Sequence, residues 1–147
     1  MAAPSTYPLP AHQPPNILLT TTKVSVISIG NSIQAYNTLH YTARVYSGSA
    51  IFPGSETPLN PVTALSARTF GTWTFLSSII RLYAAYYIDN PAVYQLALWT
   101  YVVAFGHFVS EWLYFGTARW GKGLAGPVAV STGSLVWMYL QWGWYVS

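Results

Sequence analysis

The sequence predicts an all-α, polytopic membrane protein whose four transmembrane helices form a bundle. Only 6% of the 147 residues are charged, against about 25% in a typical soluble protein, so a water-exposed surface could not be covered with charge. Aromatic residues supply 17% of the chain, and Tyr and Trp are favoured where a membrane meets water. The few charges also leave gaps close to the roughly 20 apolar residues that a membrane helix requires.

Four charge-poor segments supply the expected membrane spans. They cover residues 17–39, 70–88, 93–115 and 124–146. The first is diluted by Asn31 and Gln34, and the second is interrupted by Arg81. The third carries His107 and Glu111 in its second half, whereas the fourth has no formal charge. Because each segment is long enough to cross a bilayer, a soluble bundle of buried helices is the disfavoured alternative.

Proline, glycine and asparagine separate these segments. Residues 1–16 contain five prolines, which predicts a disordered tail in front of a transmembrane domain over residues 17–147. Glycine and proline also mark residues 46–60 as a loop, and residues 116–123 join the third and fourth spans. The Asp-Asn-Pro sequence at residues 89–91 predicts a tight turn, so the second and third spans should form a close antiparallel hairpin.

Charge in the loops predicts an orientation. With four spans, the first and third loops lie on one side of the membrane, and they contain Arg44, Glu56, Arg68, Arg119 and Lys122. Positively charged loops prefer the cytoplasmic side. We therefore expect both termini on the lumenal side.

Polar residues within or beside the spans are the candidate site residues, because burying them in lipid costs free energy. The candidates for packing or partner docking are Asn31, Gln34, Arg68, Arg81, His107 and Glu111. At 1.5 Å per residue, Arg81 lies roughly 13 Å from the turn and Glu111 roughly 31 Å from it, so these two should not pair. Arg68 lies at the depth of Glu111, and we expect an ion pair between them. Arg81 is expected to extend back toward the turn.

His107 and Glu111 lie four residues apart and share a helix face. One interpretation is a metal pair or a proton relay, and the other is a hydrogen-bonded pair that fixes helix packing near the interface. A metal site needs further ligands, and the other histidines are His12 in the tail and His40 at the end of the first span. The packing interpretation is therefore favoured.

Two further patterns concern contacts between helices. Asn31 and Gln34 share a face of the first span, where amides either hold a bundle together or bind a partner helix. Ala125, Ala129 and Gly133 recur every four residues in the last span. Such small residues allow close helix approach, within the bundle or with a partner.

The sequence lacks the motifs of ordinary membrane enzymes. It has no cysteine, no G-x-G-x-x-G fingerprint and no G-x-S-x-G elbow. Residues 116–123 imitate a phosphate-binding loop, but Gly123 stands where Ser or Thr is needed and no strand precedes it. Basic residues are scattered singly, which disfavours nucleic-acid binding. We therefore expect no catalytic residue, no cofactor and no bound metal.

Short blocks of the sequence resemble a known family. They are NSIQ at residues 31–34, YTAR at 41–44, ARTFGTWT at 67–74, RLYAA at 81–85, LWT at 98–100, HFVSE at 107–111 and GTAR at 116–119. In this order they resemble the ergosterol biosynthetic protein 28 family in its filamentous-fungal form. The resemblance extends from about residue 16 to the C-terminus.

The resemblance implies a multi-pass protein of the endoplasmic reticulum membrane without catalytic residues. Family members act as scaffolds in sterol C-4 demethylation. The implied partners are the C-4 methylsterol oxidase, the C-3 sterol dehydrogenase (decarboxylating) and the 3-keto sterol reductase. Membrane lipid is a further expected partner, and the sequence leaves self-association open.

Two other classes of function stay open at this point. The first is a sterol- or lipid-binding protein with an aromatic-lined cavity. The second is a small transporter or channel that uses Arg81, His107 and Glu111 as a relay, although the different depths of Arg81 and Glu111 disfavour it.

Overall fold

The computed structural model describes residues 16–49 and 60–146. The expected tail and most of the 46–60 loop lie outside the described residues. All regular elements of the described chain are helices: α1 (Asn16–Asn37), α2 (His40–Val45), α3 (Ala64–Tyr86), α4 (Pro91–Leu113), α5 (Lys122–Leu140) and α6 (Trp142–Tyr145). The all-α prediction is therefore confirmed.

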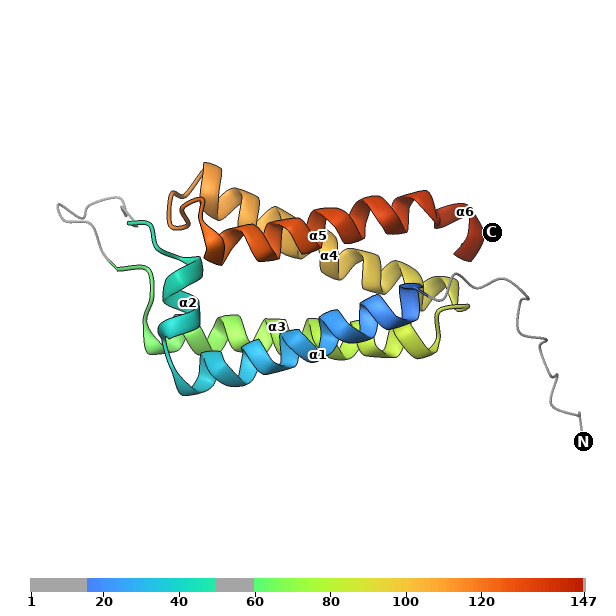
Figure 1. Cartoon of the computed structure of the whole chain (residues 1–147), viewed down its shortest axis with the longest axis horizontal. Helices are drawn as coiled ribbons and strands as arrows, with labels where there is room; N and C mark the ends of the chain where they lie inside the picture. Colours follow the sequence, from blue (N-terminus) through green and yellow to red (C-terminus); the bar gives the residue numbers. More distant parts are fainter. Residues whose placement is uncertain (1–15, 50–59, 147) are drawn as a thin grey trace, which may run out of the picture.

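The four long helices run alternately in opposite directions (Figure 1). α1 packs along α3, α3 along α4, and α4 along α5. The short α2 lies at the end of the molecule where α1 ends and α5 begins, and it contacts both helices (Figure 1). Two helix pairs, α1 with α3 and α4 with α5, therefore face each other.

Two helices of the described chain, α4 and α5, have the length and apolar composition needed to cross a membrane. α1 and α3 match them in length, with 22 and 23 residues, but that they cross a membrane remains a prediction. Large apolar side chains point outward along all four long helices, as Ile27, Leu76, Trp99 and Tyr139 illustrate. Such faces are suited to contact with lipid or with another apolar helix.

Capping residues set the α3–α4 hairpin. α3 begins six residues before the expected span because Thr63 and Ser66 cap it reciprocally: Ser66 N donates to Thr63 Oγ1 at 3.1 Å and Thr63 N to Ser66 Oγ at 2.8 Å. Asn90 caps α4, accepting from Ala92 N at 3.0 Å, and Pro91 occupies the first turn, where its missing N–H is not needed. The predicted tight turn is confirmed.

The last helical segment is interrupted, contrary to the expected continuous span over residues 124–146. α5 ends at Leu140, and α6 follows after Gln141. The break turns Tyr145 onto the buried ring of Tyr94, with the two rings stacked 5.0 Å apart. Tyr94 also donates a hydrogen bond to the carbonyl of Met138 at 2.7 Å. These contacts fasten the end of the chain to α4.

At the opposite end, α2 and the α4–α5 connection form a packed cap. Val45 of α2 and Leu124 of α5 are fully buried there, and Ala118 is nearly so. Gly48 N donates to the carbonyl of Thr117 at 2.8 Å. Gly123 lies so close to the carbonyl of Arg44 that no side chain fits between them. Glycine is thus required at Gly123 by close backbone approach.

We predict that Gly123→Ala destabilises the protein by about 1–3 kcal/mol, because the added methyl group meets rigid backbone. The thermal unfolding midpoint of the purified protein in detergent is the measurement. Gly106→Ala is the matched control, since nothing lies within 4 Å of a Cβ at that helical position, and it should gain about 0.5–1 kcal/mol. Equal midpoints for Gly123→Ala and wild type would contradict the close approach.

Candidate functional site

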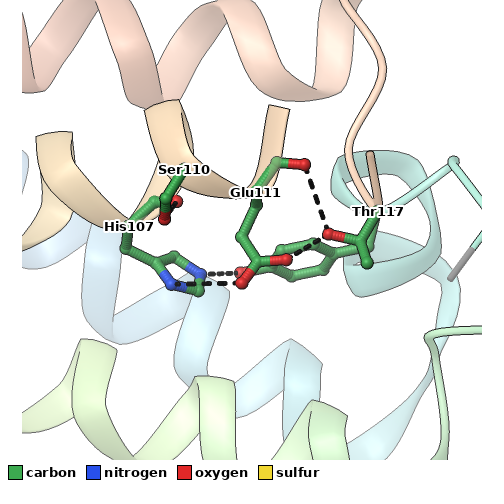
Figure 2. Close-up of polar contacts among 5 residues, drawn as sticks. His107, Ser110, Glu111 and Thr117 are labelled. Carbon is green, nitrogen blue, oxygen red and sulfur yellow. Dashed lines mark hydrogen bonds and ion pairs between the residues drawn. The ribbon is translucent and has the colours of Figure 1, made fainter. Parts of the chain in front are cut away.

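A polar cluster lies where α4 meets the cap, and we call Tyr46, His107, Glu111 and Thr117 the cap cluster. His107 and Glu111 project from one face of α4, and Thr117 reaches Glu111 from the following loop (Figure 2). Tyr46 follows α2 and reaches the same place from the other side. The cluster therefore joins the end of α4 and the loop that follows it to Tyr46, 61 residues before His107 in the sequence.

Two hydrogen bonds and one contact at ion-pair distance connect the members of the cap cluster. Tyr46 Oη lies 2.5 Å from His107 Nε2, and His107 Nδ1 lies 4.0 Å from Glu111 Oε1. The Thr117 hydroxyl donates to Glu111 Oε2 (Figure 2). Ser110 donates instead to the backbone carbonyl of His107 at 2.8 Å. His107 and Glu111 thus lie at ion-pair distance but do not form the expected hydrogen bond, and each is hydrogen-bonded to another residue instead.

Electrostatics keep the Tyr46 phenol protonated. Burial raises the pKa of this phenol, and the negative charge of Glu111 raises it further. A protonated phenol can donate to His107 Nε2, which places the imidazole proton on Nδ1, facing Glu111. The arrangement orients the histidine ring from both sides.

Aromatic rings shield the cap cluster from the rest of the bundle. Phe70 lies 5.7 Å from Tyr46, and Trp73 lies 5.5 Å from His107, both between ring centroids and edge to face. Phe108 packs 5.3 Å from the His107 ring. Edge-to-face rings at these distances attract each other. Phe70 and Trp73 lie about one helical turn apart, so the sequence indicated that they share a face of α3. It did not indicate that Tyr46 and His107 are their partners.

The chemistry of the cap cluster differs from that of a hydrolase. The side-chain hydrogen-bond partner of the imidazole is a phenol, and the hydroxyls of Ser110 and Thr117 bond elsewhere. Across residues 16–49 and 60–146, no three His, Cys, Asp or Glu side chains lie together as metal ligands would. The cluster can therefore hold segments together and share a proton, but no activated nucleophile lies within it.

Arg81 was expected to extend back toward the turn, but it does not. It is only 6% exposed; its Nε donates to Thr100 Oγ1 at 2.9 Å and its Nη2 to the Thr100 carbonyl at 3.2 Å. Its guanidinium lies 4.0 Å over the Tyr101 ring, at cation–π distance. The reason is the tight hairpin, which places α4 groups at the depth of Arg81 and offers it partners inside the bundle.

The prediction of an ion pair between Arg68 and Glu111 is also wrong. Arg68 is exposed on α3, while Glu111 turns toward His107 and Thr117. Equal depth does not bring two side chains together when they face different directions around their helices.

The two amides of α1 separate in the structure. Asn31 is half-buried, and its amide donates to the Tyr41 hydroxyl at 3.3 Å. Gln34 is exposed. Asn31 therefore serves a contact inside the bundle, whereas Gln34 is available to its surroundings.

Sequence reasoning did not locate the two adjacent cavities between the helix pairs. The larger has a volume of about 450 Å³ and the smaller about 240 Å³. All four long helices contribute to both, and Val24, Tyr101 and Val130 line both. Ala129 and Gly133 of the predicted small-residue pattern line the larger cavity. A volume of 300–1,000 Å³ is usual for a small-molecule site, on the order of what the larger cavity offers.

Comparison with known proteins identifies close relatives. A family described as "Erg28 like protein" matches residues 17–136. The ergosterol biosynthetic protein 28 of Candida albicans is 52% identical over 124 residues, which cover 84% of this chain and 83% of that protein. The protein of that name from Saccharomyces cerevisiae is 47% identical over 83% of this chain and 77% of its own length. The human homolog is 39% identical over 78% of this chain and 76% of its own length. No solved structure matches the chain significantly.

We predict that Tyr46→Phe lowers stability by about 1–2 kcal/mol, because His107 loses a hydrogen-bond partner in a partly buried place. Thermal unfolding in detergent is the measurement. Tyr86→Phe removes the same hydroxyl from a residue that is 74% exposed, and it should leave the midpoint unchanged. In a His107→Phe background the effect of Tyr46→Phe should largely vanish; an unchanged effect there would show that the two side chains are not coupled.

Proposed function

The chain belongs to the ergosterol biosynthetic protein 28 family, and from this membership we propose that it is a non-catalytic scaffold of the endoplasmic reticulum membrane. It tethers the C-4 methylsterol oxidase, the C-3 sterol dehydrogenase (decarboxylating) and the 3-keto sterol reductase. Tethering raises the effective concentration of each enzyme near the next without new chemistry. A poorly soluble sterol intermediate then stays close to the enzyme that consumes it.

One observation carries this proposal: the described helices place their polar contacts inside and apolar surface outside. The cap cluster and Arg81 bond to neighbouring helices or loops. The outer face of α4 presents Leu96, Trp99 and Val103, all at least half exposed. Their spacing of three and four residues aligns them along one side of the helix. An apolar helical stripe of this kind supports docking of partner helices better than it supports chemistry.

The proposal includes four membrane spans, with α1 and α3 crossing beside α4 and α5. Residues 17–147 then form one transmembrane domain, and the basic loops face the cytoplasm. In that position Arg44, Arg68, Arg119 and Lys122 can meet enzyme domains or anionic lipid headgroups.

Five of the six candidate polar residues divide between two roles. Asn31, His107 and Glu111 fix the packing of the bundle, because each is partly buried and bonded to another segment. Gln34 and Arg68 dock partners, because both are exposed near the α2 end of the α1–α3 pair. Arg81 belongs to the bundle interior.

A second candidate function is binding of a sterol or another lipid within the bundle. The adjacent cavities between the helix pairs favour it, since their walls are mainly apolar and include aromatic rings. Crosslinking to a sterol probe would distinguish this function from tethering alone.

We predict that affinity purification of the tagged protein from detergent-solubilised fungal membranes recovers all three enzymes, identified by mass spectrometry. Deleting this chain should separate the enzymes from one another, because the contacts between them pass through it. Recovery of the protein alone, with the enzymes still associated in the deletion strain, would refute the scaffold role.

We predict that Arg68→Ala lowers recovery of at least one enzyme severalfold, as loss of one exposed charged contact at an interface does. The control is Lys23→Ala, which removes an exposed charge nearer the other end of the bundle. Both variants must reach wild-type levels in the membrane fraction. Normal recovery of all three enzymes with Arg68→Ala would count against docking at this residue.

A further inference from the structure

Arg81 is a buried cation that has no counter-ion among residues 16–49 and 60–146. The ion pair between residues of these ranges joins His107 to Glu111 and does not include Arg81. The partners of Arg81 are the hydroxyl and carbonyl of Thr100 and the ring of Tyr101. A buried charge is strongly disfavoured unless an opposite charge compensates it. Neutral partners compensate it only in part.

Arg81 lies beside a cavity, and some of its N–H donors have no partner in the described part of the chain. A guanidinium has five N–H groups, and Nε and Nη2 each direct one of them to Thr100. Arg81 lines the smaller cavity, and so does Thr74, whose buried hydroxyl has no hydrogen-bond partner. Thr74 precedes Arg81 by two helical turns and therefore lies on the same face of α3. Two incompletely satisfied polar groups thus border one space inside the bundle.

The larger cavity is suited to an apolar body. Its walls include Ala84, Ile88, Ala97 and Met138. Tyr101 lines both cavities and carries the Arg81 guanidinium over its ring, so the cation lies near their junction. Val130 of α5 and Ile27 of α1 line the smaller cavity while also being exposed. The space is therefore open toward the surroundings of the bundle between α1 and α5.

We propose that the two cavities bind a lipid carboxylic acid, with its carboxylate on Arg81 and its apolar body in the larger cavity. This inference rests on the second candidate function and assigns its ligand class. A guanidinium matches a carboxylate with two parallel hydrogen bonds. A carboxylic acid can enter from lipid in its neutral form and bind Arg81 as the carboxylate after it gives its proton to water, whereas a phosphodiester headgroup would bring its charge through the apolar region.

The test uses the purified full-length protein in detergent and matched photoreactive probes. Each probe pair consists of an acid and the corresponding alcohol, one pair on a long-chain fatty skeleton and one on a sterol skeleton. At least one acid should label the protein about tenfold more strongly than its alcohol, as expected when a charge-assisted hydrogen bond is added. The skeleton that labels better identifies the source of the carboxylate.

Arg81→Gln should abolish the preference for acid over alcohol. Lys23→Gln removes a positive charge from an exposed position on α1, and it should retain the preference. Equal labelling of wild type by acid and alcohol would overturn the role of Arg81 while leaving lipid binding intact, and this outcome does not depend on whether Arg81→Gln folds. Absence of labelling by any probe would refute lipid binding as well, with enzyme recovery still testing the scaffold separately.

Discussion

The capped turn between α3 and α4 sets the register on which the interior of the bundle depends. Asn90 closes the first turn of α4 with its side chain, and Pro91 starts the helix immediately. Arg81 and Thr100, nine and ten residues from Asn90, consequently meet. Trp73 and His107 each lie seventeen residues from Asn90, and their rings also meet. One short connection therefore aligns both the buried cation and the aromatic shield of the cap cluster.

The other packing contacts are secured where backbones approach closely. Gly71 of α3 lies against Tyr36 and the carbonyl of Ser32, so a Cβ there would stand 2.9 Å from the Tyr36 ring. Beside it, the hydroxyls of Tyr36 and Thr72 hydrogen-bond at 2.6 Å. α1 is thereby fixed to α3, just as α2 is fixed to the start of α5 by Gly123. Small residues at these points let the backbones approach closely and so fix one element to another.

The sequence was sufficient to predict the helical class, the approximate segments and the turn at Asn90, because these depend on local composition and capping. It was not sufficient for side-chain partners, which depend on direction around each helix. Arg68 and Glu111 have matching depths but face apart, and Arg81 found partners on α4 that hydropathy does not encode. The break at Gln141 escaped prediction because it depends on the distant ring of Tyr94.

The polar groups of this bundle have different explanations according to whether their hydrogen-bonding groups have partners. The polar residues of the cap cluster are explained by packing alone, since each bond stabilises the packing of the segments that it joins. Thr42 also has a buried hydroxyl without a partner among the described residues, but it lines neither of the two cavities. Arg81 and Thr74 differ because they border a cavity, and one of them is a cation. In a chain with so few charges, a cation retained beside an internal space is explained more economically by a ligand than by packing, for which an apolar side chain of similar size would serve at least as well.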